Sequence, residues 1–254
     1  MLRRGRLTIQ VDMQAQTEQL SFLDLLPSVK PQGKNAYLAR LDQFKREMLE
    51  KPKFNLISLF CGGGGLDLGL GFAGFGSLVA SDVAPAFVDT VTKNLPHVKG
   101  LAEDAMQLTS STLRNLANTR DIDLVAAGPP CQAFSILGKR NALDDPRGKL
   151  ALKYFELIAA IQPKAFLFEN VPGLLTVNKG ADWKRLYEHA HTVTGYHIHF
   201  TKLNAASFGI PQYRERVVLV GFREARIQFQ FPNVSSSLGT LKLIPESNMY
   251  VPSS

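Results

Sequence analysis

The chain has 254 residues, of which 45% are hydrophobic and 20% charged, so it can bury a core as one large domain. No apolar run approaches the roughly 18 uncharged residues of a membrane span, and the N-terminus lacks a secretory signal, which favours a soluble, cytoplasmic protein. Lysine and arginine number 29 against 22 acidic residues, and the net charge of +7 favours a polyanionic partner. Two cysteines exclude a disulfide framework and a four-cysteine zinc site.

Residues 1–52 are expected to be an N-terminal extension with one amphipathic helix, from Asn35 to Glu50. Its apolar residues recur at helical spacing, and Pro52 ends the pattern: Tyr37, Leu41, Phe44, Met48. Residues 53–230 are expected to form the main domain. The serine- and proline-containing segment 231–254 has weak periodicity and is expected to be a tail or linker.

Apolar strands alternate with helical patterns through the main domain. The expected strands are Phe54–Phe60, Leu78–Val83, Val98–Leu101, Asp123–Ala127, Ala165–Val171, His197–Lys202 and Arg216–Phe222. The clearest helix carries an apolar face from Leu150 to Ile161. This alternation predicts an α/β fold, with a mostly parallel, twisted, Rossmann-like sheet covered by helices on both faces. Ligands of such sheets bind at the carboxyl ends of the strands.

A run of four glycines, Gly62 to Gly65, follows the first expected strand and precedes a helix from Leu66. Glycines at such a turn let backbone N–H groups approach a ligand, and the helix start adds positive potential, so a small-molecule cofactor pocket is favoured over a purely structural turn. A G-x-G-x-x-G match at residues 69–74 lies inside the expected helix and is not taken as a dinucleotide fingerprint.

Two carboxylates follow the next strands. Asp82 ends the second strand, 22 residues after Phe60, where a carboxylate typically accepts hydrogen bonds from ribose hydroxyls. Asp104 follows the third strand and could accept from an adenine amino group. Either residue alone is more often a helix cap or a solvated charge. Together, beside a glycine turn, they favour nucleoside binding.

The fourth expected strand ends in Gly128-Pro129-Pro130-Cys131. Two prolines fix the backbone and hold the Cys131 thiol on a rigid loop at the carboxyl end of a strand, which is a position suited to a nucleophile. Cys61, which lies among glycines, is instead expected to be a small apolar filler.

Glu169 closes an otherwise apolar strand, where a carboxyl group is poorly solvated unless it is paired, and it is a candidate general acid. The segment from Gln212 to Arg216 opens the last expected strand, and period-two alternation is expected to place Gln212, Arg214 and Arg216 on one side of it. The guanidinium groups could hold a phosphate or a base carbonyl, and could brace Glu169.

Taken in order, these motifs resemble those of the cytosine-C5 DNA methyltransferase family over about residues 54–222. The matching segments are Phe60-Cys61-Gly62-Gly63-Gly64, Asp82, Asp104, Gly128-Pro129-Pro130-Cys131-Gln132, Arg147-Gly148-Lys149-Leu150, Glu169-Asn170-Val171, Ala205 to Pro211 and Gln212-Tyr213-Arg214-Glu215-Arg216.

The resemblance implies a methyltransferase fold and transfer of a methyl group from S-adenosylmethionine to C5 of a flipped cytosine. The Cys131 sulfur would add at C6, Glu169 would protonate or hydrogen-bond N3, and Arg216, with Arg214 nearby, would contact O2. Implied cofactor-binding residues are Phe60, Gly62, Gly64, Asp82, Val83, Asp104, Ala105, Pro130 and Leu150. The family commonly has glutamate where this chain has Asp82, one methylene shorter.

The resemblance also implies a face toward double-stranded DNA, made of Gln132, Ser135, Lys139, Arg140, Arg147 and Gln212. The basic loop before Arg147 has a plainer interpretation as a solvated loop. Metal binding is not expected, because the i, i+2 spacing of His189 and His191 splits the pair across helix faces and no carboxylate cluster accompanies the histidines.

Family members usually continue into a variable target-recognition region and a Gly-Asn motif, for which this chain has no adequate match. We therefore expect the larger, catalytic chain of a two-polypeptide enzyme, acting in a bacterial cytoplasm or nucleoid as part of a restriction-modification system. An RNA cytosine methyltransferase and a catalytically silent cofactor-binding remnant are the alternatives.

Overall fold

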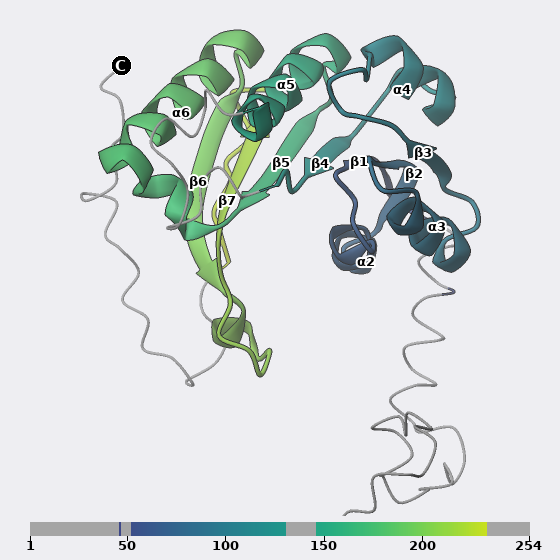
Figure 1. Ribbon diagram of the computed structural model, residues 1–254, viewed down its shortest axis with the longest axis horizontal. Helices are drawn as coiled ribbons and strands as arrows, with labels where there is room; N and C mark the ends of the chain where they lie inside the picture. Colours follow the sequence, from purple (N-terminus) through teal and green to yellow (C-terminus); the bar gives the residue numbers. More distant parts are fainter. Residues whose placement is uncertain (1–45, 47–51, 131–145, 233–254) are drawn as a thin grey trace, which may run out of the picture. The chain divides into compact units, whose positions relative to one another are not determined.

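The computed structural model describes residues 46, 52–130 and 146–232. The described strands are β1 (Phe54–Leu59), β2 (Phe75–Asp82), β3 (Lys99–Ala102), β4 (Leu124–Ala127), β5 (Ala165–Asn170), β6 (His197–Asn204) and β7 (Glu215–Phe222). They form one sheet in the order β3-β2-β1-β4-β5-β7-β6 (Figure 1). Neighbours from β3 to β5 are parallel, whereas β7 is antiparallel to both β5 and β6. The carboxyl ends of β1, β2, β3, β4 and β5 therefore share one edge with the start of β7.

The described helices are α2 (Gly65–Phe72), α3 (Pro85–Asn94), α4 (Ser110–Ala117), α5 (Pro146–Ile161) and α6 (Ala181–Thr194), with short 3₁₀ turns at Pro172–Leu175, Val177–Gly180 and Ala205–Phe208. Local sequence sets several ends. Pro85 begins α3, where its missing N–H is not needed. The Thr109 side chain caps α4 by accepting from the Thr112 N–H. Gly195, at φ 68°, ends α6.

Helices cover the two faces of the sheet (Figure 1). Successive residues of β1 face opposite ways: Leu56 packs in a cluster with Leu70 of α2, whereas Ile57 packs in the large core with residues of α4, α5 and α6. On the α2 side, α3 contributes Val91 to a smaller cluster. The central strands are thus buried on both sides, which explains why they are continuously apolar. The predicted mostly parallel sheet with two covered faces is confirmed.

An aromatic layer holds α5 against the sheet. Tyr154 and Phe155 of α5 pack on Phe166 and Phe168 of β5, with ring centroids 5.4 to 6.2 Å apart. The buried Tyr154 hydroxyl lies within hydrogen-bond distance of two strand carbonyls, 2.9 Å from that of Val125 and 3.0 Å from that of Leu167. Burial raises the pKa of Tyr154 well above its ordinary value, so the hydroxyl stays a donor. This contact fixes the middle of α5 against β4 and β5.

At the β6 end of the sheet, the described part of the chain has helices on one face. The Trp183 ring of α6 packs at a tilt against the Phe200 ring of β6, with centroids 4.7 Å apart. On the other face the half-buried rings of His199 and Phe222 are met by Phe229, which follows β7. We call this second surface the open face. No helix between residues 52–130 or 146–232 covers it (Figure 1).

Every strand expected from the sequence is present, with ends that move by a few residues. The expected helix from Asn35 to Glu50 and the tail lie almost wholly outside the described residues, so the predicted division into extension, domain and tail stays a prediction. Among residues 52–130 and 146–232, no helix has the length and apolar character that a membrane span requires.

Candidate functional site

The glycine turn, residues 61–65, joins β1 to α2 at the carboxyl edge. The Cys61 N–H donates to the Ser81 carbonyl of β2 at 3.0 Å, and the Gly64 N–H donates back to the Cys61 carbonyl at 2.9 Å. Gly64 needs its φ of 84°, and a Cβ there would lie 3.1 Å from a methyl carbon of Val91. A Cβ at Gly62 or Gly63 would meet no atom within 4 Å, so these residues face open space.

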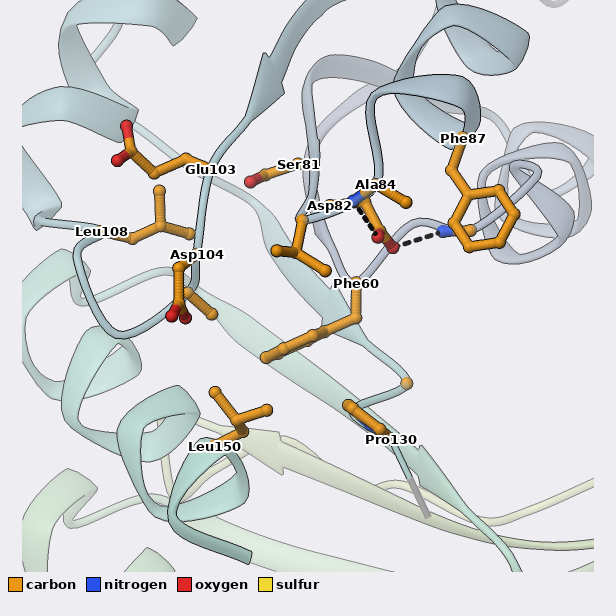
Figure 2. Close-up of a pocket in the computed structure, with 14 residues that line it drawn as sticks. Phe60, Ser81, Asp82, Ala84, Phe87, Glu103, Asp104, Leu108, Pro130 and Leu150 are labelled. Carbon is orange, nitrogen blue, oxygen red and sulfur yellow. Dashed lines mark hydrogen bonds between the residues drawn. The ribbon is translucent and has the colours of Figure 1, made fainter. Parts of the chain in front are cut away.

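Asp82 ties the ends of β1 and β2 together at this edge. One carboxylate oxygen accepts from the Gly62 N–H at 3.0 Å and the other from the Ala84 N–H at 3.0 Å (Figure 2). A short side chain suits these two local bonds. Each oxygen retains a second lone-pair position for a ligand hydroxyl.

A cavity of about 500 Å³ opens beside this turn. It is lined by Phe60, Gly62, Ser81, Asp82, Val83, Ala84, Phe87, Glu103, Asp104, Ala105, Leu108, Gly128, Pro130 and Leu150. In Figure 2 the Phe60 ring extends into it, with Leu150 and Pro130 on one side and Asp82 on the other. The size is within the usual range for small-molecule sites, about 300–1,000 Å³. Lining residues come from the end of β2 and from the segments directly after β1, β3 and β4, so the cavity lies where a parallel sheet places its ligands.

Eight of the nine residues expected to bind a cofactor line this cavity, and Gly64 does not. Sequence reasoning missed several lining residues: Ser81, Ala84, Phe87, Glu103, Leu108 and Gly128. Most are chain neighbours of an identified motif residue, and that adjacency was the available signal. Phe87 has no such neighbour, because it reaches the cavity from the first turn of α3, and it is 48% exposed. No motif marks it.

The cavity is acidic at the ends of β2 and β3. Asp104 lies on the loop after β3, where its carboxylate accepts from the Met106 N–H at 2.9 Å. Glu103 precedes it, and Asp82 lies across the cavity. Among the described lining residues none is lysine, arginine or histidine, so the lining favours polar hydroxyl or amino groups or a positively charged ligand over a phosphate.

A second polar centre adjoins the cavity. Glu169, at the end of β5, pairs with the Nε of Arg216 on β7 at 2.8 Å, and each side chain is 25% exposed. The pairing forms because antiparallel β7 begins at the edge where β5 ends. The sequence suggested that a guanidinium group could brace Glu169, and Arg216 does so; the general-acid role of Glu169 stays a prediction.

Gly128 connects the two centres. It lines the cavity, and a Cβ at this position would lie 3.3 Å from Oε2 of Glu169. The glycine therefore lets the carboxylate approach the wall of the cavity closely.

Asn170 fixes the turn that follows β4. Its side chain is 1% exposed, its amide donates to the Pro129 carbonyl at 3.2 Å, and its amide oxygen accepts from the Val171 N–H at 2.9 Å. The residue after Glu169 thus holds the backbone two positions before Cys131. The sequence marked the Glu-Asn-Val segment but not this contact.

Gln212 and Arg214 do not lie on β7, which begins at Glu215, so the strand alternation expected for them is wrong. The chain between β6 and β7 folds into a 3₁₀ turn and a bend, and the Asn204 side chain accepts from the N–H groups of Ala206 and Arg214. Both residues are exposed there, beside Tyr213, which is 71% exposed. Only Arg216 of this group contacts Glu169 among the described pairs.

Several predicted site residues lie outside the described residues: Cys131, Gln132, Ser135, Lys139 and Arg140. Arg147 is in the first turn of α5, and its side chain is not described. The roles expected of these residues stay predictions.

Cys61 is buried, as expected of a small apolar filler, and packs with Ala80, Val91 and Val98. Burial, with the nearby carboxylates of Asp67 and Asp82, raises the pKa of its thiol to about 12. Such a thiol is unreactive at neutral pH. In the described part of the chain no group of three or more His, Cys, Asp or Glu side chains is arranged to hold a metal ion.

Comparison with known proteins gives a consistent family. A family model described as C-5 cytosine-specific DNA methylase matches residues 54–252. The Type II methyltransferase M.AquIA of Picosynechococcus is 40% identical over 186 residues, covering 70% of this chain and 75% of that protein. M1.HphI of Haemophilus parahaemolyticus is 38% identical, covering 70% of this chain but 48% of the relative.

Solved structures share the fold. A crystal structure described as a prophage-encoded DNA modification methyltransferase from E. coli is 30% identical, with a TM-score of 0.59 over 67% of this chain and 47% of its own. DNMT2 of Spodoptera frugiperda is 20% identical, with a TM-score of 0.55 over 72% of this chain and 54% of its own, and shows the fold alone. Apart from M.AquIA, the chain thus spans about half the length of these relatives.

Proposed function

Because the chain belongs to the C-5 cytosine-specific DNA methylase family, we propose that it is the catalytic chain of a DNA cytosine-C5 methyltransferase that uses S-adenosylmethionine. The observation that carries the proposal is the position of Gly128. The cavity, which suits a nucleoside, and the Glu169–Arg216 pair lie on either side of Gly128, with only its backbone between them. A methyl donor in the cavity and a base at the ion pair would then be neighbours, and Cys131 follows Gly128 by three residues in the sequence.

The cavity residues fit the proposed cofactor. The Phe60 ring offers a flat apolar surface for adenine, with Val83 and Leu150 among the lining residues. Asp82 keeps acceptor capacity for ribose hydroxyls, and Asp104 for an amino group. The remaining predicted contacts are Gly62, Ala105 and Pro130, with Gly64 shaping the turn. When bound, S-adenosylmethionine supplies a methyl group activated by a sulfonium.

The chain's own residues would activate the base. Cytosine C5 is a weak nucleophile, so the Cys131 thiolate adds at C6 and pushes electrons toward C5. Glu169 donates a hydrogen bond or proton at N3, and Arg216 contacts O2, which lowers the charge on the adduct. C5 would then take the methyl group as the methyl–sulfonium bond breaks, which would leave a neutral thioether. Loss of the C5 proton to a base breaks the sulfur–C6 bond and restores the aromatic ring.

Duplex DNA is the proposed substrate, with the target cytosine flipped out of the stack. Exposed Gln212 and Arg214 lie at the same edge as the Glu169–Arg216 pair, and exposed Tyr213 between them offers a further contact. The other predicted contacts are Gln132, Ser135, Lys139, Arg140 and Arg147. Since the substrate is cellular DNA, we place the activity in a bacterial cytoplasm, within a restriction-modification system.

A second polypeptide is part of the proposal. In the described part of the chain, the open face presents the half-buried rings of His199 on β6, Phe222 on β7 and Phe229. A partner that carries the target-recognition region would cover this surface. Assaying the purified chain alone tests this component: efficient, sequence-specific methylation without any partner would refute it.

Trapping the covalent adduct tests the chemistry. With DNA that contains 5-fluorocytosine, fluorine cannot leave C5 as a proton does, so the enzyme stays joined to the DNA. We expect a denaturation-resistant complex with the wild type, formed with the partner present if needed. Cys131→Ala should form none while it still binds S-adenosylmethionine, and Cys61→Ala should behave as the wild type. An adduct that persists in Cys131→Ala rejects the proposed function.

A further inference from the structure

Asp67 is a buried carboxylate that the mechanism above does not use. It lies in the first turn of α2 and is 2% exposed. One oxygen accepts from the Ser58 hydroxyl of β1 at 2.8 Å, and the other accepts from the Ser77 hydroxyl of β2 at 2.6 Å. Both serines are also buried, at 1% and 3%. One carboxylate therefore joins three elements at a point that solvent does not reach.

A buried charge is costly unless its hydrogen bonds are made. Asp67 has only neutral hydroxyl donors among its described side-chain partners, supplemented by the positive end of α2. An apolar residue would pack at such a position with less cost. The carboxylate therefore calls for an explanation other than stability.

The position of Asp67 supplies one. Gly64, the N-cap of α2, is three residues before it and accepts from the Leu68 N–H at 2.9 Å. Ser58 lies two residues before Phe60, whose ring enters the cavity. On the other side of the glycine turn, Asp82 holds Gly62. Two carboxylates thus fix the turn, one from its helical end and one from its strand end.

We propose that Asp67 is a positioning residue for cofactor binding, which locks the first turn of α2 onto β1 and β2 through Ser58 and Ser77 and so sets the glycine turn. This inference rests on the proposed function, because it takes the cavity beside the turn as the S-adenosylmethionine site. Asp67 touches no ligand in this role. Its effect is carried by the backbone of residues 61–65.

The test compares S-adenosylmethionine binding by titration calorimetry with stability and with steady-state kinetics. Asp67→Ala should weaken binding about tenfold or more, which corresponds to about 1.4 kcal/mol. Asp67→Asn, which keeps the shape but loses the charge, and Ser58→Ala and Ser77→Ala, which each remove one donor, should give smaller losses in the same direction. The KM for cofactor should rise in parallel, while kcat at saturating cofactor stays within about threefold.

Thr194→Val is the matched control. The Thr194 hydroxyl is also buried, donating to the Ala190 carbonyl at 2.7 Å and accepting from the Tyr196 N–H at 3.1 Å, but it lies where β6 begins, at the opposite edge of the sheet. It should lower the thermal midpoint without changing cofactor affinity. A role of Asp67 in folding alone would give the same result for the Asp67 variants.

Cofactor affinity within twofold of the wild type in the folded Asp67 variants overturns the proposal, and so does a loss that Thr194→Val reproduces. If Asp67→Ala does not fold, Asp67→Asn and the serine variants decide by the same criteria. A wild-type chain that binds no S-adenosylmethionine, with its partner present, would instead refute the proposed function. The two failures are thereby distinguished.

Discussion

The contact between Glu169 and Arg216 is a single ion pair whose removal should be felt in catalysis. Arg216→Ala leaves Glu169 without its 2.8 Å partner and removes the proposed contact to the base. We expect kcat to fall about 100-fold, as when one charge-stabilising donor is lost, and Arg216→Lys to recover part of it. Single-turnover methylation measures the effect.

Arg226→Ala provides the control for that substitution. It removes an ion pair of similar length, 2.7 Å to Glu224, but one that is largely exposed and remote from the cavity lining. Its effect on methylation should be less than about twofold. Equal effects of the two substitutions would contradict the assigned role of Arg216.

Cys61 and Cys131 should differ in reactivity. The Cys61 thiol is 6% exposed and its pKa is raised to about 12, so it stays protonated until the pH approaches that value. At pH 8 its thiolate fraction is about one in ten thousand. Iodoacetamide at this pH should modify Cys131 and spare Cys61 in the folded chain, and modify both in denaturant, as read by peptide mass spectrometry. Rapid labelling of native Cys61 would be inconsistent with this account.

Among single residues, the sequence predicted correctly those cavity side chains that directly follow the end of a strand. Asp82, Asp104 and Pro130 were located in this way, because a strand end fixes where the next residues lie. Phe87 could not be located, since its entry depends on how α3 is oriented over β2. The Asp67–Ser58–Ser77 contact was equally inaccessible, because its three members lie on three different elements, α2, β1 and β2, and meet only after the sheet forms.

The turn after β4 is held in place by Asn170, a residue of the neighbouring strand β5. Asn170→Ala removes the donor to the Pro129 carbonyl and should loosen the turn that leads to Cys131. We expect the rate of adduct formation with 5-fluorocytosine DNA to fall about tenfold, and stability to fall by about 1–3 kcal/mol because a buried carbonyl loses its partner. Asn94→Ala, which removes an exposed helix contact, is the control. An unchanged adduct rate would show that the turn is fixed without Asn170.

Strand existence followed from apolar runs and turn residues, but strand direction did not. β7 shares its apolar pattern with the parallel strands, and its reversal depends on how the segment between β6 and β7 folds around Asn204. That reversal is what brings Arg216 to the carboxyl edge. The misplacement of Gln212 and Arg214 on a regular strand has the same origin, since local alternation carries no information about where a 3₁₀ turn interrupts the chain.

For the whole molecule, the net charge of +7 should make DNA binding strongly dependent on salt. Raising salt from about 50 to 200 mM should weaken binding of duplex DNA at least about tenfold. The reason is that releasing counterions from DNA gains less entropy when the surrounding salt concentration is higher. S-adenosylmethionine affinity should change by less than about threefold, since few charges are paired in the cavity. Fluorescence anisotropy and calorimetry on the same preparation measure both. Salt-independent DNA binding would argue against phosphate contacts.

Phe60 departs from the backbone geometry that a stable chain would select. Its φ of 53° places an aromatic residue in the left-handed region, at a cost of about 1 kcal/mol that glycine would avoid. Phe60→Gly should therefore relax the backbone between β1 and α2 while removing the flat surface proposed to hold the nucleoside. A substitution at Phe60 that raises the thermal midpoint should therefore lower the affinity for the proposed cofactor. Selection for thermal stability alone would favour loss of this ring.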